Sequence, residues 1–388
     1  MTYAHVRAAV LALVLAGPTA APAHAAEPRD PWVRAWGLNT AGQLGNSSLL
    51  DQQTPSSVQG LARSAVRELS GGGGNNVNSF ALALLHDGTV QSWGGNSNGQ
   101  LGNGTTTAQA FPGTVAGLSG VSQVAAGVHF AFAVRGGRLL SWGDNAFGQL
   151  GNGATESTAT TRPVAVQSLN RVKDVVAGCY HAAALREDGT VWTWGRNTDG
   201  QLGIGSTTDQ NTPKKVPGLV DAVAVAIGCY HTVALTADGT VKAWGRGAYG
   251  QLGNDSTDSS PSPVDVKHLD DVASIHSGSY HSFAVLDDGS VRAWGWNTAG
   301  QLGDGTTVDR TTPVPAPGLS GVKALTGGWK HSLAVLDDGS VLAWGENGSG
   351  QLGDGTTTNS LTPVTALPPG SGTTRVAAST VWKASYAY

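Results

Sequence analysis

The sequence is poor in charged residues and in the residues that fill long helices. Only 13% of its 388 residues are charged, and Leu, Glu and Lys are too scarce to build long amphipathic helices. The 23 basic residues are outnumbered by 27 acidic ones, for a net charge of −4. Such a chain lacks the positive field that binds nucleic acid or an anionic membrane. Its 56 Gly residues and 40% hydrophobic residues indicate a folded protein with many turns.

Hydrophobic runs are too short to cross a bilayer, which needs about 20 residues. The apolar run at 8–16 follows a weakly basic start and precedes Gly17-Pro18 and a small-residue segment that ends at Ala25. This pattern predicts a signal peptide over residues 1–25, cleaved near Ala25, and a short linker over 26–31. We therefore expect a secreted, extracellular protein with no membrane span.

Cysteine is nearly absent. Cys179 and Cys229 lie 50 residues apart in identical Gly-Cys-Tyr-His segments, so their spacing follows a repeat and not a metal-binding motif. A disulfide requires Cα atoms within about 7 Å of each other. We expect two unpaired, buried thiols, and a bridge between neighbouring repeats is the alternative.

A ten-residue string, Trp-Gly-x-Asn-x-x-Gly-Gln-Leu-Gly, accounts for the organisation of the chain. It occurs at 36–45, 93–102, 142–151, 194–203, 244–253, 294–303 and 344–353, with Gly247 replacing Asn in one copy. A period near 50 residues is typical of a solenoid or a propeller. Most units also carry an Asp-Gly pair between two short β-rich runs, which predicts a tight hairpin.

The expected strands are apolar on both faces, as in residues 281–285, where large and small side chains alternate. Such sheets are covered when the large face of one stacks on the small face of the next, so we predict that the seven repeat Trp residues pack between blades. The last copy of the repeat, residues 376–388, lacks its hairpin partner, and a matching strand stands alone at 33–37. The sequence therefore predicts an all-β, seven-bladed β-propeller over 32–388, closed by pairing of the N- and C-terminal strands.

These units resemble the repeats of the regulator of chromosome condensation family, and the resemblance covers about residues 32–388. It implies a seven-bladed β-propeller. The founding eukaryotic members are nucleotide-exchange factors for a small nuclear GTPase and use a β-wedge inserted into the ring. The Gly-rich stretch at 71–76 has no apolar side chain to form a wedge, so the resemblance does not extend to that activity.

Catalytic and metal-binding patterns are missing. His181, His231, His281 and His331 share one repeat position with Phe80, Phe130 and Ala384, so we interpret it as a packing position between blades and not as a metal site. Asp304, Asp354, Asn103 and Asn152 lie in loops with too few carboxylates for calcium, and we expect Asx turns there.

The one Gly-x-Ser-x-Gly match, centred on Ser97, has no helix after it, and other residues replace this Ser in the sister repeats. We expect no enzyme activity, no cofactor and no metal.

Aromatic and basic residues gather at positions that vary between repeats. They are Tyr180, Tyr230, Tyr280, Trp329, Lys330, Trp382 and Lys383, just before the shared His position, and Trp296, with Phe147 and Tyr249, in the loops of the ten-residue string. Rigid rings beside Lys are typical of protein-binding surfaces, so we predict a ligand-binding rim. The alternative is that these side chains line the central channel.

The sequence as a whole predicts a secreted, non-catalytic, monomeric scaffold whose rim loops bind a protein or cell-envelope ligand, and it predicts no nucleic-acid binding. Two other functions stay open. The protein could inhibit a secreted enzyme, since exported β-lactamase inhibitor proteins resemble this repeat family. It could also be an exported glycan-active enzyme on a propeller scaffold, for which a pair of carboxylates at a channel mouth would be the sign.

Overall fold

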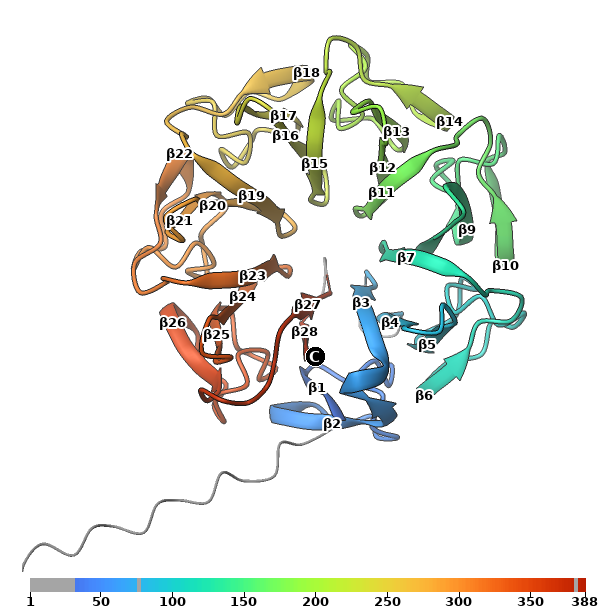
Figure 1. Cartoon of the computed structure of the whole chain (residues 1–388), viewed down its shortest axis with the longest axis horizontal. Helices are drawn as coiled ribbons and strands as arrows, with labels where there is room; N and C mark the ends of the chain where they lie inside the picture. The colour runs from blue at the N-terminus through green and yellow to red at the C-terminus, as the bar shows by residue number, and fades with distance from the viewer. Residues whose placement is uncertain (1–31, 75–77, 380–382) are drawn as a thin grey trace, which may run out of the picture. The chain divides into compact units, whose positions relative to one another are not determined.

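The computed structural model describes residues 32–74, 78–379 and 383–388. These residues form seven four-stranded antiparallel sheets arranged as the blades of a propeller (Figure 1). The predicted signal peptide at 1–25 and linker at 26–31 lie outside the described residues. Within the described residues no helix has the length and hydrophobicity to span a membrane, and the helical turn η1 (Arg63–Ala65) is a single short 3₁₀ segment.

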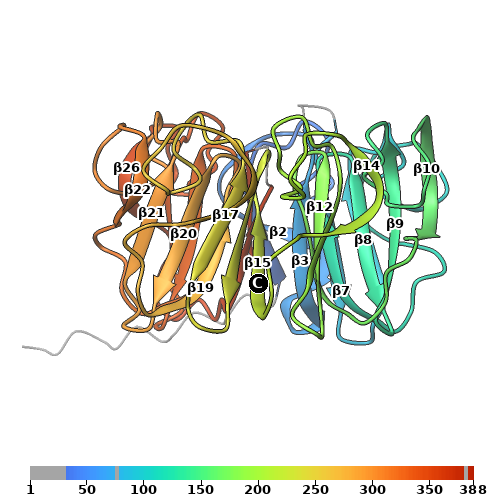
Figure 2. The same cartoon turned by 90° about the horizontal axis from the view of Figure 1, so that it is seen from above.

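Each blade contributes one strand to each of four concentric layers, and Figure 2 shows these strands running between two rims of turns. The strands nearest the axis are β3 (Val66–Gly72), β7 (Val121–Ala126), β11 (Val172–Ala177), β15 (Ala222–Ile227), β19 (Val272–Ser277), β23 (Val322–Gly327) and β27 (Val376–Ala378). The second layer is β4 (Phe80–Leu85), β8 (Phe130–Arg135), β12 (His181–Arg186), β16 (His231–Thr236), β20 (His281–Leu286), β24 (His331–Leu336) and β28 (Ala384–Ala387).

The third layer carries the Trp-Gly of the repeat and consists of β5 (Val90–Gly94), β9 (Arg138–Asn145), β13 (Val191–Gly195), β17 (Val241–Gly245), β21 (Val291–Gly295), β25 (Val341–Gly345) and β1 (Trp32–Gly37). The outer strands are β6 (Gln109–Thr114), β10 (Glu156–Ala165), β14 (Gln210–Lys215), β18 (Ser260–Asp265), β22 (Arg310–Pro315), β26 (Ser360–Leu367) and β2 (Gln52–Ala62).

The two ends of the propeller share one blade. Its strand order is β2-β1-β28-β27, and β1 pairs with β28 in antiparallel register from Arg34 opposite Ala387 to Gly37 opposite Ala384. In Figure 1 the first strands lie beside the last ones. The predicted closure is confirmed, and its physical reason is that each lone strand would otherwise leave a row of backbone groups without partners.

The repeat Trp residues are buried at the contacts between blades, as predicted. Each indole Nε1 donates a hydrogen bond to the carbonyl of the repeat Gln in the preceding blade, and Trp36 closes the ring by donating to Gln351 at 2.9 Å. Gly353 has φ +72°, and a Cβ there would lie 2.7 Å from Trp36 Nε1. This close approach explains why the string ends in Gly.

The shared His position is a packing position between blades, which confirms that prediction. His281 Nε2 lies 3.1 Å from Ser332 Oγ of the next blade, and the other three His residues meet Thr232, Ser282 and Ser385 in the same way. Where the position holds Phe80, Phe130 or Ala384, the corresponding residue of the next blade is Ala. Burial lowers the pKa of each of these His residues to about 3, so they pack as neutral rings.

The loops predicted as Asx turns have that geometry. Asp304 Oδ1 accepts a hydrogen bond from the backbone N–H of Thr306 at 3.0 Å, and Asp354, Asn103 and Asn152 accept equivalent bonds. These side chains therefore shape turns. Ser97 lies in a turn followed by another turn, and its Oγ donates to Asn78 Oδ1 at 2.6 Å, so it does not form a nucleophile elbow.

Candidate functional site

Two variable residues of each blade are held side by side on one rim. The backbone N–H of the residue after Trp-Gly donates to the carbonyl of the residue before the His position, as between Arg196 and Tyr180 at 2.9 Å. The other pairs are Arg246 with Tyr230, Trp296 with Tyr280, Glu346 with Lys330, Leu38 with Lys383, Gly95 with Ser79 and Asp144 with His129. We call these seven pairs the paired rim positions. They bring residues that are far apart in sequence side by side, and most of the pairs keep part of their side chains exposed, whereas Leu38 and Ser79 are buried.

The aromatic residues of this rim form two groups of rings in contact, which are linked by the Arg196 guanidinium that lies over rings of both. One group is Phe147 with Tyr180, and the other is Tyr230, Tyr249, Tyr280, Trp296 and Trp329. We call the seven residues together the aromatic arc. Neighbouring ring centroids lie 5.3 to 6.3 Å apart, mostly in edge-to-face or tilted geometry, which suits the charge distribution of aromatic rings. All seven side chains are half-buried, so each keeps part of its surface available for contact.

Cations lie over the rings of the arc. The Arg196 guanidinium is 5.1 Å from the Phe147 centroid, and Arg246 is 5.5 Å from that of Tyr249. Lys330 Nζ is 4.3 Å from Trp296, and Lys383 forms a 3.0 Å ion pair with Glu346. Such contacts fix the positive groups in place without removing their charge.

The structure brings together seven of the eight predicted site residues. Trp382 lies outside the described residues. Arg196, Arg246 and Glu346 were not predicted, although all three occupy the variable position directly after Trp-Gly that also holds Trp296. The backbone hydrogen bond between neighbouring strands places the residue after Trp-Gly beside the Tyr before the His position. This contact cannot be read from the sequence pattern of either position.

No member of the arc belongs to the lining of the cavity on the axis. This cavity has a volume of about 300 Å³, and its lining comes from the strands nearest the axis. Instead, Tyr180, Tyr230 and Tyr280 pack on a small buried cluster of Val128 and the two Cys residues. The rings therefore rest on a rigid floor, and burial raises the pKa of Tyr280 to about 12.

The two cysteines are joined in a disulfide, so the prediction of unpaired thiols is wrong. Their Cα atoms are 4.5 Å apart, well inside the distance a disulfide requires. The physical reason is that both residues precede the second strand of adjacent blades, where the blades converge toward the axis. The bridge ties the backbone next to Tyr180 to the backbone next to Tyr230.

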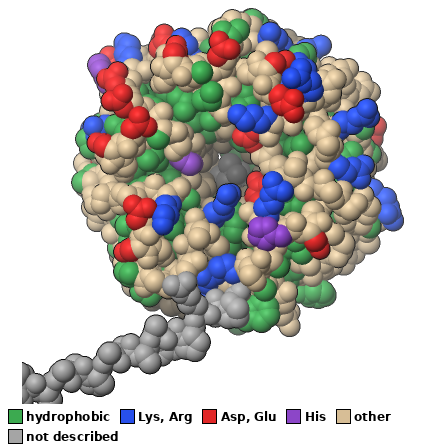
Figure 3. Space-filling model, in the orientation of Figure 1, with side chains coloured by type: hydrophobic (Ala, Val, Ile, Leu, Met, Phe, Trp, Pro, Cys, Tyr) green, Lys and Arg blue, Asp and Glu red, His purple; other side chains and the backbone are tan. Residues whose placement is uncertain are grey.

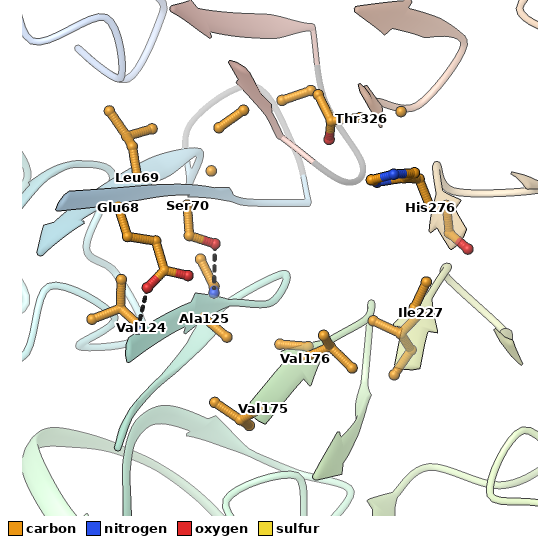
Figure 4. Close-up of a pocket in the computed structure, with 18 of the residues that line it drawn as sticks. Glu68, Leu69, Ser70, Val124, Ala125, Val175, Val176, Ile227, His276 and Thr326 are labelled. Carbon is orange, nitrogen blue, oxygen red and sulfur yellow. Dashed lines mark hydrogen bonds between the residues drawn. The ribbon is translucent and has the colours of Figure 1, made fainter. Parts of the chain in front are cut away.

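The cavity wall is engaged in contacts between blades. Glu68 Oε2 accepts a hydrogen bond from the backbone N–H of Val124 at 3.2 Å, and Ser70 Oγ accepts one from Ala126 at 3.0 Å (Figure 4). In the same way, Gln123 Oε1 accepts a hydrogen bond from the backbone N–H of Val175, and Gln123 Nε2 donates one to the Asp174 carboxylate. Burial raises the pKa of Glu68 to about 7 and raises that of Asp174 as well. These side chains cover edge N–H groups of the next blade.

On the face shown in Figure 3, acidic and basic side chains of the described residues are mixed, and no extended patch of one sign is seen there. Among residues 32–74, 78–379 and 383–388, no group of three or more His, Cys, Asp or Glu side chains is placed to hold a metal ion. The aromatic arc is thus the feature of the described surface with the clearest chemical character.

Comparison with known proteins identifies the family. The model of the RCC1-like domain matches residues 160–388, and that of the regulator of chromosome condensation (RCC1) repeat matches 33–77 and 87–134. Among curated relatives, the probable E3 ubiquitin-protein ligase HERC6 of Homo sapiens is 35% identical over 202 residues, which are 49% of this chain and 19% of HERC6. The ultraviolet-B receptor UVR8 of Arabidopsis thaliana is 33% identical over 184 residues, 47% of this chain and 30% of the receptor. The chain thus spans less than a third of either relative.

Solved structures agree on the fold. Human WBSCR16 superposes with a TM-score of 0.80 at 24% identity, covering 92% of this chain and 99% of that one. Prp20p of Saccharomyces cerevisiae gives 0.80 at 22% identity, covering 92% and 90%. These likenesses, the seven closed blades and the family models that match both halves together lead to one assignment: the chain belongs to the RCC1-like domain family of β-propellers.

Proposed function

We propose that the protein is an exported, non-catalytic scaffold that binds a protein partner through the aromatic arc. The observation that carries this proposal is the arc itself: seven half-buried rings in two contacting groups, bridged by Arg196, at positions that the repeat leaves free to vary. Large rigid rings give contact area at low entropic cost, which is why they dominate binding hot spots.

The buried residues beneath the Tyr rings of the arc, Val128 and the disulfide of Cys179 and Cys229, support a role in binding. The disulfide and the paired backbone bonds fix the rings before any partner arrives, and preorganisation of this kind increases affinity because less freedom is lost on binding. A disulfide also suits an oxidising compartment, which supports the predicted secretion. Prp20p, which has the same fold, has binding properties to Gsp1p and histones, so a protein ligand has a precedent on this fold.

A capture experiment tests the proposal. Immobilised wild-type protein and a variant carrying Tyr180→Ala, Tyr230→Ala and Tyr280→Ala would be exposed to culture supernatant and envelope extract of the producing cells. The matched control carries Phe111→Ala and Val220→Ala, which remove apolar side chains that are 53% and 59% exposed on the outer strand β6 and just before β15.

We expect a partner that is retained by wild type and control and lost by the rim variant, followed by direct measurement of affinity with the purified partner. Retention of every partner by the rim variant would refute the arc as the site. Nanomolar inhibition of a β-lactamase would identify the partner as an enzyme and make the protein an inhibitor.

One observation favours the glycan-active alternative, namely the carboxyl groups of Glu68 and Asp174, whose raised pKa values would suit a general acid. Both groups are already engaged in contacts between blades, so we propose that they are structural. Hydrolysis of a glycan by wild type that Glu68→Gln abolishes without loss of folding would overturn this assignment.

A further inference from the structure

Two arginines of the rim lie over aromatic rings and form no ion pair with a described carboxylate. The Arg196 guanidinium lies 5.1 Å from Phe147, 5.7 Å from Tyr180 and 5.6 Å from Tyr230, measured to ring centroids. Arg246 lies 5.5 to 6.0 Å from three rings, and it shares the Tyr230 ring with Arg196. Within residues 32–74, 78–379 and 383–388, neither arginine forms an ion pair with a carboxylate.

Two other half-buried basic residues do have an acidic partner. Lys383 on the same rim is paired with Glu346 at 3.0 Å, and half-buried Arg310 is paired with Asp304 at 2.7 Å. A half-buried guanidinium without an anion gives up part of its hydration, and the aromatic rings compensate for only part of that loss. The two unpaired arginines are therefore the places where a ligand can supply the missing charge.

The geometry leaves hydrogen-bond donors for a ligand. A guanidinium has five N–H donors arranged in a planar fork. The side chain of Arg196 donates from Nε to Thr198 Oγ1 at 3.1 Å, and within the described part of the chain that of Arg246 donates no hydrogen bond. Because the rings restrict the planes of both forks, less entropy is lost when an anion binds.

We propose that the Arg196–Arg246 pair binds the carboxylates of an acidic segment of the protein partner. This inference rests on the proposed function and names the chemistry of the partner. An extended segment with two Asp or Glu residues can reach both forks, since the arginines flank one ring, while its other side chains contact the aromatic arc. Carboxylates match the bidentate geometry of a guanidinium.

Two acidic side chains lie near the aromatic arc. Asp144 and Asp199 lie close enough to the arc to influence the Tyr180 and Tyr280 hydroxyls. Asp144 is held by Gln149 at 2.9 Å, and Asp199 accepts a bond from Thr198. They offset part of the positive charge of the two arginines, and the phosphoserine peptide in the experiment below separates a phosphate from a carboxylate.

The test uses fluorescence anisotropy with a short labelled peptide of alternating Gly and Glu, and with its Gly-Gln counterpart. We expect wild type to bind the Glu peptide at least about tenfold more tightly than the Gln peptide, since each charge-assisted fork contributes about tenfold. Arg196→Gln with Arg246→Gln should abolish this preference. Arg196→Lys with Arg246→Lys should lower it, because Lys keeps the charge and loses the fork.

The matched control is Lys214→Gln with Lys215→Gln, which removes two exposed charges from the outer strand β14 and should leave the preference intact. An equal loss in this control, or a preference that survives in the Arg-to-Gln variant, would overturn the inference. Tighter binding of a phosphoserine peptide or of heparin would overturn the assignment of carboxylates.

The capture experiment separates this inference from the proposed function. If the partner is lost from the Tyr variant and retained by the Arg-to-Gln variant, the scaffold function stands and the acidic segment is refuted. If both variants lose the partner and the Glu peptide competes for it, both proposals are supported.

Discussion

The pair formed by His281 and Ser332 between two blades can be exchanged for the pair found elsewhere in the same ring. Phe130 occupies the position of His281, and Ala182 of the next blade occupies that of Ser332. The surroundings match: Phe130 meets Phe132 edge-to-face at 5.5 Å, and His281 meets Phe283 edge-to-face at 5.2 Å. The variant His281→Phe with Ser332→Ala should therefore fold and pack well.

The predicted effect of this exchange depends on pH. Burial lowers the pKa of His281 to about 3, whereas His in an unfolded chain titrates near 6.5. Below about pH 6.5 the unfolded chain binds a proton that the folded chain does not, so acid destabilises the wild type. For one such His the loss between pH 7 and pH 5 is about 2 kcal/mol. The double variant should escape this loss.

Urea unfolding followed by Trp fluorescence at pH 7, 6 and 5 measures the difference. We expect the free energy of unfolding of the double variant, relative to that of wild type, to rise by about 2 kcal/mol as the pH falls from 7 to 5. In the single variant Ser332→Ala, the free energy of unfolding at pH 7 should fall by about 1–3 kcal/mol, because a buried ring nitrogen of His281 loses its hydroxyl partner. This variant should still lose stability in acid, because it retains His281. Parallel pH profiles for wild type and double variant would refute the reasoning.

Three further predictions concern stability. Replacing Cys179 and Cys229 by Ala should lower the free energy of unfolding by about 2–4 kcal/mol, and wild type treated with a reductant should then unfold at the same urea concentration as the variant. Trp36→Ala should lower the free energy of unfolding by about 3–5 kcal/mol, because it leaves a cavity at the contact of the closing blade, and the melting temperature should fall. An unchanged melting temperature would contradict the closure. Glu68 has a pKa raised to about 7 by burial, so the folded chain keeps a proton that the unfolded chain releases above about pH 4.5, and stability should fall as the pH rises through this window. In Glu68→Gln, the decrease of the free energy of unfolding over this pH window should be smaller by about 1–3 kcal/mol. The same pH dependence of urea unfolding in variant and wild type would contradict this prediction.

The fold could be predicted because its determinants repeat. Seven copies of one string give the blade number, the Asp-Gly pairs give the hairpins, and the unpaired strands at 33–37 and 376–388 give the closure. Each of these is a local pattern with a local physical reason. The wrong prediction concerned Cys179 and Cys229, because their separation in space depends on how blades converge near the axis, which a linear spacing of 50 residues does not reveal.

The candidate site could be predicted in part, because some of its residues recur at one position of the repeat. Tyr180, Tyr230 and Tyr280 stand at one repeat position and are visible as a trend. Arg196 and Arg246 stand at another position, and their place beside the Tyr residues follows from a bond across the strands of a blade. Which rim position contacts which is a property of the folded register, so it could not be read from either position alone.

The paired rim positions separate what the ring must keep from what it can change. Indole bonds, turns and buried rings hold the blades together in the interior, while most blades offer two adjacent places with side chains that differ from blade to blade. A gene encoding such a ring can replace these residues blade by blade and acquire a new specificity without rebuilding its architecture. The same property makes the protein a suitable starting point for libraries in which only the rim is randomised.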